Sequence, residues 1–191
     1  MASDGPQLSP GEIAALASTI GRPIVLVGMM GVGKSSVGKR LAAALECPFI
    51  DADEEIEKAA QRTIPEIFEA FGEAQFRDGE RRVIARLIEE DAALKVIATG
   101  GGAFCNAETR ALILDKAITI WLDSDVDTLV ERTARRGNRP LLEQGDPREI
   151  LSRLREERAP AYAQAPIHVT SRDGPHGRTV NQVLKAIQAW L

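Results

Sequence analysis

One glycine-rich stretch constrains this chain more than any other feature. It is Gly28-Met29-Met30-Gly31-Val32-Gly33-Lys34-Ser35, which matches the pattern G-x-x-x-x-G-K-[ST] in full. It follows an apolar, β-branched run at 24–28 and precedes a helical pattern that begins near its lysine. A glycine inside regular structure costs roughly 0.5–1 kcal/mol relative to alanine, so several together indicate a backbone that other residues cannot adopt. Strand, tight loop and helix in this order are the context of a phosphate-binding loop.

The residue types in this loop suit a triphosphate. Glycines allow successive backbone N–H groups to point into one concavity, with a helix N-terminus behind it, and such a concavity binds anions. Lys34 adds a compact positive charge for the β- and γ-phosphates, and the Ser35 hydroxyl can ligate Mg²⁺. The alternative is a glycine-rich turn that happens to precede a lysine. The full match in its proper context favours a nucleoside triphosphate site.

Short β-branched runs alternate with longer helical patterns from Pro23 onward. The predicted strands are IVLVG (24–28), PFID (48–51), KVIAT (95–99), ITIWLD (118–123) and IHVT (167–170). Runs that are apolar on both faces and separated by helices predict a parallel sheet covered on both sides. Ligands of such sheets bind beyond the carboxyl ends of the strands, so the residues that follow each strand are the candidates for function.

Two carboxylates follow the second predicted strand, at Asp51 and Asp53. A spacing of two on an extended segment points both side chains to one side of the sheet, near the phosphate loop. One can orient Mg²⁺ through water while the other accepts a proton from, or hydrogen-bonds, a substrate hydroxyl. Alternatively, Asp53 only caps the helix that follows. Spacing alone leaves both interpretations open.

Three adjacent glycines, Gly100, Gly101 and Gly102, follow the third predicted strand. A strand-to-helix turn needs only one glycine, so the triplet favours close approach of the backbone to a ligand, with a plain turn as the alternative. This third strand does not end in the aspartate of a conventional Walker B motif, and Asp51 is the best candidate for the metal-orienting carboxylate.

Three arginines stand out by their context. Arg77 is expected at the start of a helix, Arg139 lies in the basic stretch RRGNRPLLE between two helices, and Arg158 precedes Pro160, which is expected to disrupt or end its helix. A single arginine is more often a solvated or salt-bridged surface residue than a ligand. A mobile basic segment over the phosphate site would form a lid that brings Arg139 to the transferred charge. Two arginines distant in sequence can clamp a carboxylate bidentately.

Composition sets the remaining limits. The chain has 191 residues, of which 44% are hydrophobic and 27% charged, as expected of one medium globular domain. A net charge of −4 predicts no nucleic-acid or membrane partner. Cys47 and Cys105 indicate reduced thiols, and the first ten residues lack the form of a signal peptide, so we expect a cytoplasmic protein. No large apolar surface stripe is evident, which favours a monomer.

The N-terminus is expected to be an extension, residues 1–21, that precedes the single domain at 22–191. Its first nine residues have a composition typical of disorder. Ser9-Pro10-Gly11-Glu12 then has the form of a capping box with proline at the first helical position, which predicts a short helix through about Ile20.

Taken together, these motifs make the chain similar to the shikimate kinases. The resemblance runs from about Pro23 to the C-terminus and rests on GMMGVGKSSVGKRLA, FIDADEEIE, GEAQFR, TGGGA, NRPLL and ERAPAY, in family order. It implies a three-layer αβα fold of the P-loop kinase type, with a five-stranded parallel sheet in the order 2-3-1-4-5 and a lid at about 134–148. The N-terminal extension and the segment SRDGPHGRTV depart from the family pattern.

The resemblance also implies site residues. For ATP it implies Gly31, Val32, Gly33, Lys34, Ser35, Ser36, Arg132 and Arg139, with Arg132 near the adenine. For shikimate it implies Asp53, Arg77, Gly101, Gly102 and Arg158, with Lys34, Asp53 and Arg139 as the catalytic residues. One Mg²⁺ would be held by Ser35 directly and by Asp51 through water. Arg172 or Arg178 are candidates for a further contact with adenine.

The activity implied is transfer of the γ-phosphoryl group of ATP to the 3-hydroxyl of shikimate, a step of aromatic amino-acid biosynthesis. The nearest rival is another small P-loop metabolite kinase, such as a gluconate kinase, which lacks this combination of arginine and glycine motifs. A switch GTPase normally carries an N-K-x-D tetrapeptide, and none occurs here. A non-catalytic ATP-binding module predicts no phosphate acceptor at all.

Overall fold

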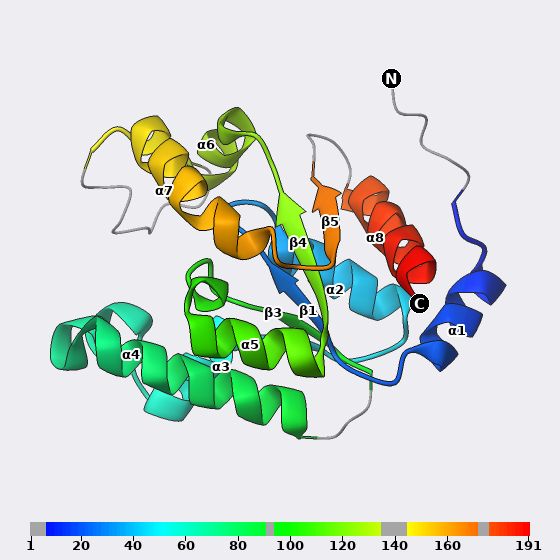
Figure 1. Ribbon diagram of the computed structural model, residues 1–191, viewed down its shortest axis with the longest axis horizontal. Helices are drawn as coiled ribbons and strands as arrows, with labels where there is room; N and C mark the ends of the chain where they lie inside the picture. Colours follow the sequence, from blue (N-terminus) through cyan, green and yellow to red (C-terminus); the bar gives the residue numbers. More distant parts are fainter. Residues whose placement is uncertain (1–6, 91–93, 135–144, 172–175) are drawn as a thin grey trace.

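A five-stranded parallel sheet forms the centre of the molecule (Figure 1). The computed structural model describes residues 7–90, 94–134, 145–171 and 176–191. The strands are β1 (Ile24–Val27), β2 (Phe49–Asp51), β3 (Val96–Ala98), β4 (Ile118–Asp123) and β5 (Ile167–Thr170). They lie in the order β2-β3-β1-β4-β5, and all pairs are parallel. The predicted strands, their parallel arrangement and their order are therefore confirmed.

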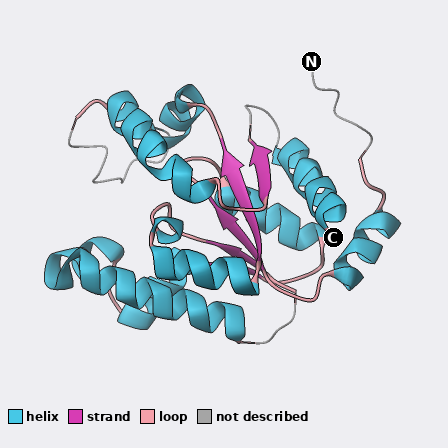
Figure 2. Cartoon of the chain, in the orientation of Figure 1, coloured by secondary structure: helices cyan, strands magenta, loops and turns pink. Residues whose placement is uncertain are grey.

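The sheet forms because its central strands are apolar on both faces. All four residues of β1 are 0% exposed, and Leu26 pairs in register with Ala98 on one side and Ile120 on the other. Burial of the two faces requires helices on both, as Figure 2 shows. The helices α2 (Lys34–Ala44) and α8 (His176–Trp190) pack together on one face.

The other described helices flank the sheet and lie before or between its strands along the chain. They are α1 (Pro10–Thr19), α3 (Ala52–Ala60), α4 (Ile64–Glu89), α5 (Ala107–Lys116), α6 (Val126–Ala134) and α7 (Pro147–Tyr162), with a 3₁₀ turn η1 (Ala103–Cys105). The helix α4 packs against α3 and α5, on the side of the sheet opposite α8 (Figure 1). The carboxyl ends of β1, β2 and β3 open between these helices and α7.

The N-terminal helix begins as the sequence predicts. Ser9 caps α1 in a capping box with Glu12, and Pro10 occupies the first turn. Residues 1–6 lie outside the described part of the chain. The expectation of disorder is wrong for Leu8 and Ser9: the backbone N–H of Leu8 donates to Asn181 Oδ1, and Leu16 and Ile20 belong to the main core. This extension is therefore anchored to α8 by a hydrogen bond and to the main core by Leu16 and Ile20.

Helix α4 is longer than the sequence suggested, and it is kinked. It begins with a second capping box, from Thr63 to Glu66, and its backbone departs from helical angles only at Gly72, with φ 77°. Arg77 therefore lies within α4, one turn after the kink, and not at the start of a helix. The first half of α4 has its own start signal in the sequence, the capping box of Thr63 and Glu66.

Pro160 does not end its helix, contrary to expectation. Helix α7 continues to Tyr162, with Pro160 inside it. Proline removes one helical hydrogen bond and crowds the preceding turn. Here the chain after it is fixed, because the backbone N–H of Ala163 donates to Ala159 O and the Tyr162 side chain is buried. Among the described residues, no helix is long and apolar enough to cross a membrane. The predicted lid at 134–148 lies mostly outside the described residues.

Candidate active site

The glycine-rich loop after β1 has a backbone that only glycine adopts easily. Gly28, Gly31 and Gly33 have φ values of 137°, 80° and 101°, in the left-handed half of the Ramachandran plot. Space also excludes a side chain: a Cβ atom at Gly28 would lie 2.2 Å from Leu122 O, and one at Gly31 would lie 2.7 Å from Thr133 Cγ2. The loop thus forms the tight turn that the motif requires, directly before α2.

Lys34 is enclosed by this loop. It is the first residue of α2, it is 9% exposed, and its Nζ donates to Gly28 O at 2.7 Å and to Met29 O at 2.9 Å. The carbonyls at the start of the loop hold the ammonium group at the N-terminal end of α2, where the helix dipole is also positive. The positive charge is fixed where the motif predicts an anion.

Ser35 and Asp51, the two residues predicted to act on a metal ion, are in direct contact. Ser35 Oγ donates to Asp51 Oδ2 at 2.8 Å, and the other oxygen, Asp51 Oδ1, accepts from the backbone N–H of Asp53 at 3.1 Å. The pair offers a hydroxyl and a carboxylate oxygen beside the phosphate loop, which is the ligand chemistry that Mg²⁺ prefers.

The two aspartates are brought together differently from the prediction. Asp51 ends β2 and is the N-cap of α3, so Asp53 stands in the first turn of that helix. They are not on one extended segment, and the alternative that Asp53 caps the helix is also wrong. The helix begins at Ala52 because Asp51 already supplies the capping oxygen.

The glycine triplet after β3 is closely approached by charged side chains at each position. A Cβ atom at Gly100 would lie 2.7 Å from Asp53 Oδ1, and one at Gly101 would lie 3.3 Å from Arg158 Nη1. At Gly102 it would lie 2.5 Å from Nη2 of Arg77. Three elements distant in sequence therefore place their charged groups against this backbone. A plain turn does not account for all three glycines; contact of the triplet with a ligand stays a prediction.

Glu80 is a site residue that the sequence reasoning missed. It is 1% exposed, and its Oε2 accepts from Arg77 Nη1 at 2.7 Å. Its Oε1 faces Gly100 beside Asp53. Burial raises the pKa of Glu80, and the nearby Asp53 adds to the rise, while Arg77 and Arg158 oppose it. The available signal was the i, i+3 spacing of arginine and glutamate in FRDGE, which predicts a pair on one helix face.

Arg158 carries an unsatisfied donor. Within the described part of the chain, its Nη1 is buried and has no hydrogen-bond partner. A buried donor without an acceptor costs about 1–3 kcal/mol, and more when it is charged. The atom lies beside Gly101 and the backbone N of Met30, where the phosphate loop and the glycine triplet meet. An anionic group at this point would satisfy it.

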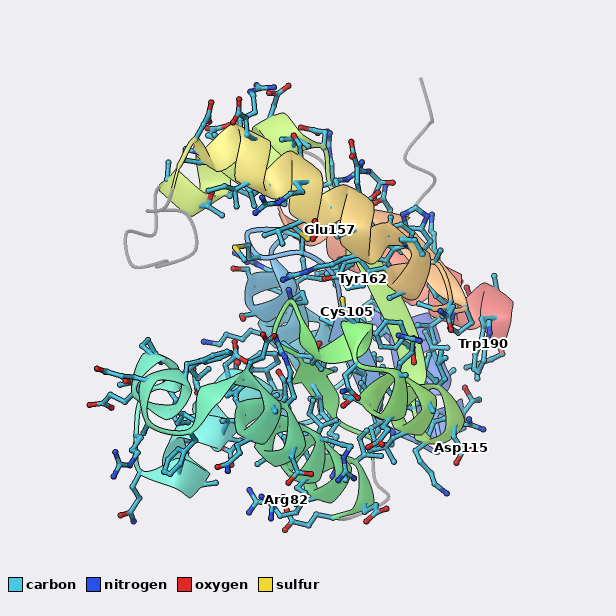
Figure 3. The ribbon with its side chains drawn as sticks, turned by 60° about the vertical axis from the view of Figure 1, so that its left-hand side comes forward. Arg82, Cys105, Asp115, Glu157, Tyr162 and Trp190 are labelled. Atoms are coloured by element: carbon cyan, nitrogen blue, oxygen red, sulfur yellow. The ribbon has the colours of Figure 1, made fainter. Side chains whose placement is uncertain are left out.

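Tyr162, at the end of α7, and Cys105, at the end of η1, lie close to each other where these two elements pack together (Figure 3). The Tyr162 hydroxyl donates to Gly101 O, and burial raises the pKa of this phenol. Burial likewise raises the pKa of the Cys105 thiol, although Arg158 and Arg77 lower it in part. Both groups are therefore neutral near pH 7. They support the glycine backbone without adding charge to the site.

Arg132 lies against the phosphate loop. Its Nη1 donates to Val32 O at 3.0 Å and to Ser171 Oγ at 3.2 Å, so it joins α6 to the loop and to the end of β5. Ser36 follows Ser35 in the first turn of α2. Arg178 is exposed in the first turn of α8, while Arg139 and Arg172 lie outside the described residues.

Two groups of charged residues thus meet at the carboxyl ends of the strands. One surrounds the loop after β1 and holds Lys34 and the Ser35–Asp51 pair. The other surrounds the triplet after β3 and holds the four side chains Asp53, Arg77, Glu80 and Arg158. The first suits a polyphosphate with its metal ion, and the second suits a small acid with a hydroxyl group.

Comparison with known proteins agrees with this arrangement. The family model for shikimate kinase matches residues 30–188. A shikimate kinase of Novosphingobium aromaticivorans is 61% identical over 193 residues, 100% of both chains. One from Caulobacter vibrioides is 56% identical over 173 residues, 91% of this chain and 86% of its own. The solved structure of the shikimate kinase from Acinetobacter baumannii in complex with shikimate is 37% identical, with a TM-score of 0.84 over 92% of this chain and 97% of that one.

Proposed function

The chain belongs to the shikimate kinase family, and from that premise we propose which residues carry out each part of the reaction. The protein is an ATP-dependent kinase that uses Mg²⁺ and converts shikimate to shikimate 3-phosphate, in aromatic amino-acid biosynthesis. The observation that carries the assignment of residues is the charged cluster around the glycine triplet, where the buried Nη1 of Arg158 lies beside Gly101 and has no hydrogen-bond partner among the described residues.

The loop from Gly31 to Ser36 holds the ATP phosphates in this proposal. Its backbone N–H groups and Lys34 face the β- and γ-phosphates, and Arg132 approaches the nucleotide from α6. The hydroxyl of Ser35 and, through water, the carboxylate of Asp51 hold Mg²⁺, which when bound neutralises phosphate charge. The 2.8 Å hydrogen bond between these two side chains supports the assignment, because both oxygens already point to one place.

Arg77 and Arg158 bind the carboxylate of shikimate, and the backbone at Gly101 and Gly102 forms the wall behind it. A carboxylate between two guanidinium groups satisfies the orphaned Nη1 of Arg158 by a charge-assisted hydrogen bond. Glu80 holds the Arg77 guanidinium in place and is therefore a positioning residue.

Asp53 accepts the proton of the 3-hydroxyl group. The hydroxyl oxygen forms a bond to the γ-phosphorus, the bond from that phosphorus to the β–γ bridging oxygen breaks, and ADP leaves with the electron pair. Little covalent chemistry falls to the protein in such a transfer, so positioning and charge stabilisation dominate. Lys34 supplies charge stabilisation from the loop, and Arg139 supplies it from the lid segment.

An acceptor screen tests this function. Release of ADP is measured with shikimate, with gluconate and without an acceptor, and we expect release that depends on shikimate. Stimulation by gluconate instead would favour the other metabolite kinase, and equal release in all three would indicate an ATP-binding module.

A pair of variants tests the residues. Arg158→Ala should raise the KM for shikimate, whereas Arg153→Ala, on the same helix, should not, because Arg153 is 68% exposed and pairs only loosely with Glu157. An unchanged KM in Arg158→Ala would refute the carboxylate assignment. We further propose that the protein acts in the cytoplasm as a monomer. The free thiols of Cys47 and Cys105 support the first point.

A further inference from the structure

A pocket lies between α3 and α4, the helices that also carry Asp53 and Arg77 of the candidate active site. We propose that this cavity, between α3 and α4, binds a small carboxylate with an apolar ring or chain, and that its occupancy alters the affinity for shikimate. The cavity has a volume of about 360 Å³. Small-molecule sites usually measure about 300–1,000 Å³, so it is large enough for one ring with a short acidic chain.

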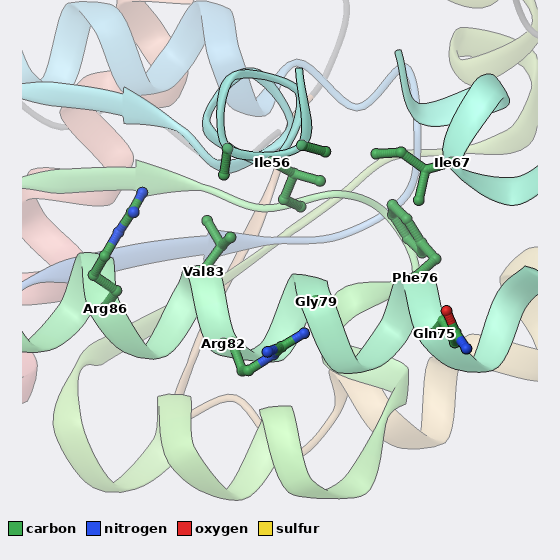
Figure 4. A pocket seen from close by; sticks show the side chains of 10 residues that line it. Ile56, Ile67, Gln75, Phe76, Gly79, Arg82, Val83 and Arg86 are labelled. Atoms are coloured by element: carbon green, nitrogen blue, oxygen red, sulfur yellow. The ribbon is translucent and has the colours of Figure 1, made fainter. Parts of the chain in front are cut away.

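The inner wall of the cavity is apolar. Ile56, Ile67 and Phe76 form a hydrophobic cluster separate from the main core and are 5%, 7% and 5% exposed. Together with Val83 they line the cavity from α3 and from both sides of the kink in α4 (Figure 4). Such a surface favours an apolar ring, because burial of the ring removes apolar area from water.

Gly79, which has no side chain, leaves space in the cavity. Gly79 faces it from the middle of α4, and a Cβ atom there would have nothing within 4 Å. Its φ is not positive, and neither the backbone nor packing requires glycine. Glycine is among the least favourable residues inside a helix, so an open site explains Gly79 better than stability does.

Two arginines stand at the rim, Arg82 and Arg86, which are 71% and 47% exposed. Arg82 pairs with Asp78 at 3.1 Å. Arg86 faces two acids, Glu55 at 3.9 Å and Glu90 at 3.7 Å, and both separations exceed hydrogen-bond length. Exposed pairs of this kind contribute little, so a ligand carboxylate can replace them on Arg86. Among the described residues, the lining of the cavity contains these two arginines and no acid, so it favours an amphiphilic acid whose carboxylate replaces Glu55 and Glu90 on Arg86.

Each wall of the cavity adjoins a residue of the proposed shikimate site. Ile56 lies one turn after Asp53 on α3, while Phe76 and Gly79 precede Arg77 and Glu80 on α4. A ligand between the two helices fixes their separation, and with it the distance from Asp53 to Arg77. This coupling rests on the proposed function, whereas binding to the cavity does not. Linkage requires shikimate and the second ligand to change each other's affinity by the same factor.

Calorimetric titration of the full chain with 3-phenylpropionate tests binding. The expected dissociation constant is below about 5 mM, as the usual efficiency of a ligand of this size gives. The uncharged 3-phenylpropionamide should bind at least about threefold more weakly, because it lacks the charge that Arg86 recognises. Absence of binding at 20 mM, roughly four times that limit, or full displacement by saturating shikimate, would overturn the proposal.

Variants locate the site. Gly79→Leu should abolish binding while the protein stays folded by thermal unfolding, because leucine fills the cavity and favours the helix. Arg86→Gln should weaken binding at least about threefold. Arg81→Gln is the matched control: Arg81 lies on the same helix, pairs with Asp78 and Glu108, and does not line the cavity. Binding that survives Gly79→Leu, or that falls equally in Arg81→Gln, would overturn the proposal.

Kinetics test the coupling. Saturating 3-phenylpropionate should change the KM for shikimate by at least about threefold and leave the KM for ATP unchanged, because the cavity adjoins only the shikimate residues. An unchanged KM for shikimate would overturn the coupling. A failed acceptor screen would instead overturn the proposed function, and the calorimetric result would be unaffected, so the two failures are distinguishable.

Discussion

Replacement of Glu80 by glutamine separates the function of this residue from its contribution to stability. Glutamine has nearly the same shape and can still accept a hydrogen bond from Arg77, but it carries no charge. Glu80 is buried, so its charged form is disfavoured, yet that charge is what holds the Arg77 guanidinium at 2.7 Å. We therefore expect Glu80→Gln to weaken shikimate recognition without unfolding the protein.

The magnitude follows from the contact. A hydrogen bond between charged partners contributes about 1.5–3 kcal/mol, and a neutral one about 1 kcal/mol. Arg77 is 23% exposed and keeps a second acid, Glu73, at 3.5 Å, which limits the loss. A loss of about 1–2 kcal/mol in the placement of Arg77 corresponds to a decrease of roughly 5–30-fold in kcat/KM for shikimate.

The stability of Glu80→Gln relative to the unmodified protein should increase as pH rises. Burial raises the pKa of Glu80 in the folded protein, so the folded state binds this proton more tightly than the unfolded state. The resulting stability is present below the unfolded pKa and is lost as pH rises through the raised folded pKa. Glutamine does not titrate, so the melting temperature of Glu80→Gln should gain on that of the unmodified protein over this interval.

Two assays check the prediction: steady-state kinetics with shikimate varied at saturating ATP, and thermal unfolding over a pH series that starts at about pH 4, near the ordinary pKa of a glutamic acid, and extends to about pH 8. Glu80→Asp is the matched control, since it keeps the charge and shortens the reach. The reasoning is refuted if Glu80→Gln retains full kcat/KM, or if it loses several kcal/mol of stability at pH 8.

Three further predictions concern the two halves of the site. Lys34→Ala should lower kcat at least ~10²-fold in the ADP-release assay, because one lost charge donor costs about 3 kcal/mol; near-normal turnover would remove Lys34 from its role. Arg158→Ala should cost about 2–5 kcal/mol in kcat/KM for shikimate, and unchanged kinetics would contradict the clamp. Gly102→Ala should raise the KM for shikimate with little change in melting temperature, because its Cβ atom would displace the Arg77 guanidinium, at 2.5 Å, and not the backbone. An unaltered KM would show that Arg77 need not hold this position.

Much of the fold was predictable because local sequence and tertiary structure agree. Strand β1 is buried on both faces, and its apolar run is continuous, so pattern alone identifies it. The strand order came from the resemblance and not from periodicity. Pro160 was misjudged because tertiary contacts, such as the burial of Tyr162, hold the chain in a helix beyond it. The first half of α4 has a local start signal instead, the capping box of Thr63 and Glu66, and Gly72 kinks the helix without ending it.

The candidate site was predictable where one segment supplies the chemistry and less so where several meet. The loop from Gly28 to Ser35 contains its own geometry, so the motif predicts it completely. The approach of Asp53, Arg77 and Arg158 to the glycine triplet depends on how α3, α4 and α7 pack, which no single segment encodes. Glu80 was missed because its importance arises only from burial.

Around the glycine triplet, ionisable groups of Glu80 and Arg158 are buried, and burial disfavours their charged forms. Glu80 is buried with a raised pKa, and Arg158 has a buried donor without an acceptor in the described chain. Such groups reduce the stability of the fold, so their presence needs a compensating interaction. In the proposed assignment, a substrate carboxylate at the glycine triplet provides one, because it satisfies Arg158 and offsets the positive charge that Arg77 shares with it. The proposal therefore expects recognition to depend on the anion as much as on the hydroxyl group. An acceptor without a carboxylate would leave the buried Nη1 of Arg158 without a partner in the described chain, and sites built this way reject such analogues strongly.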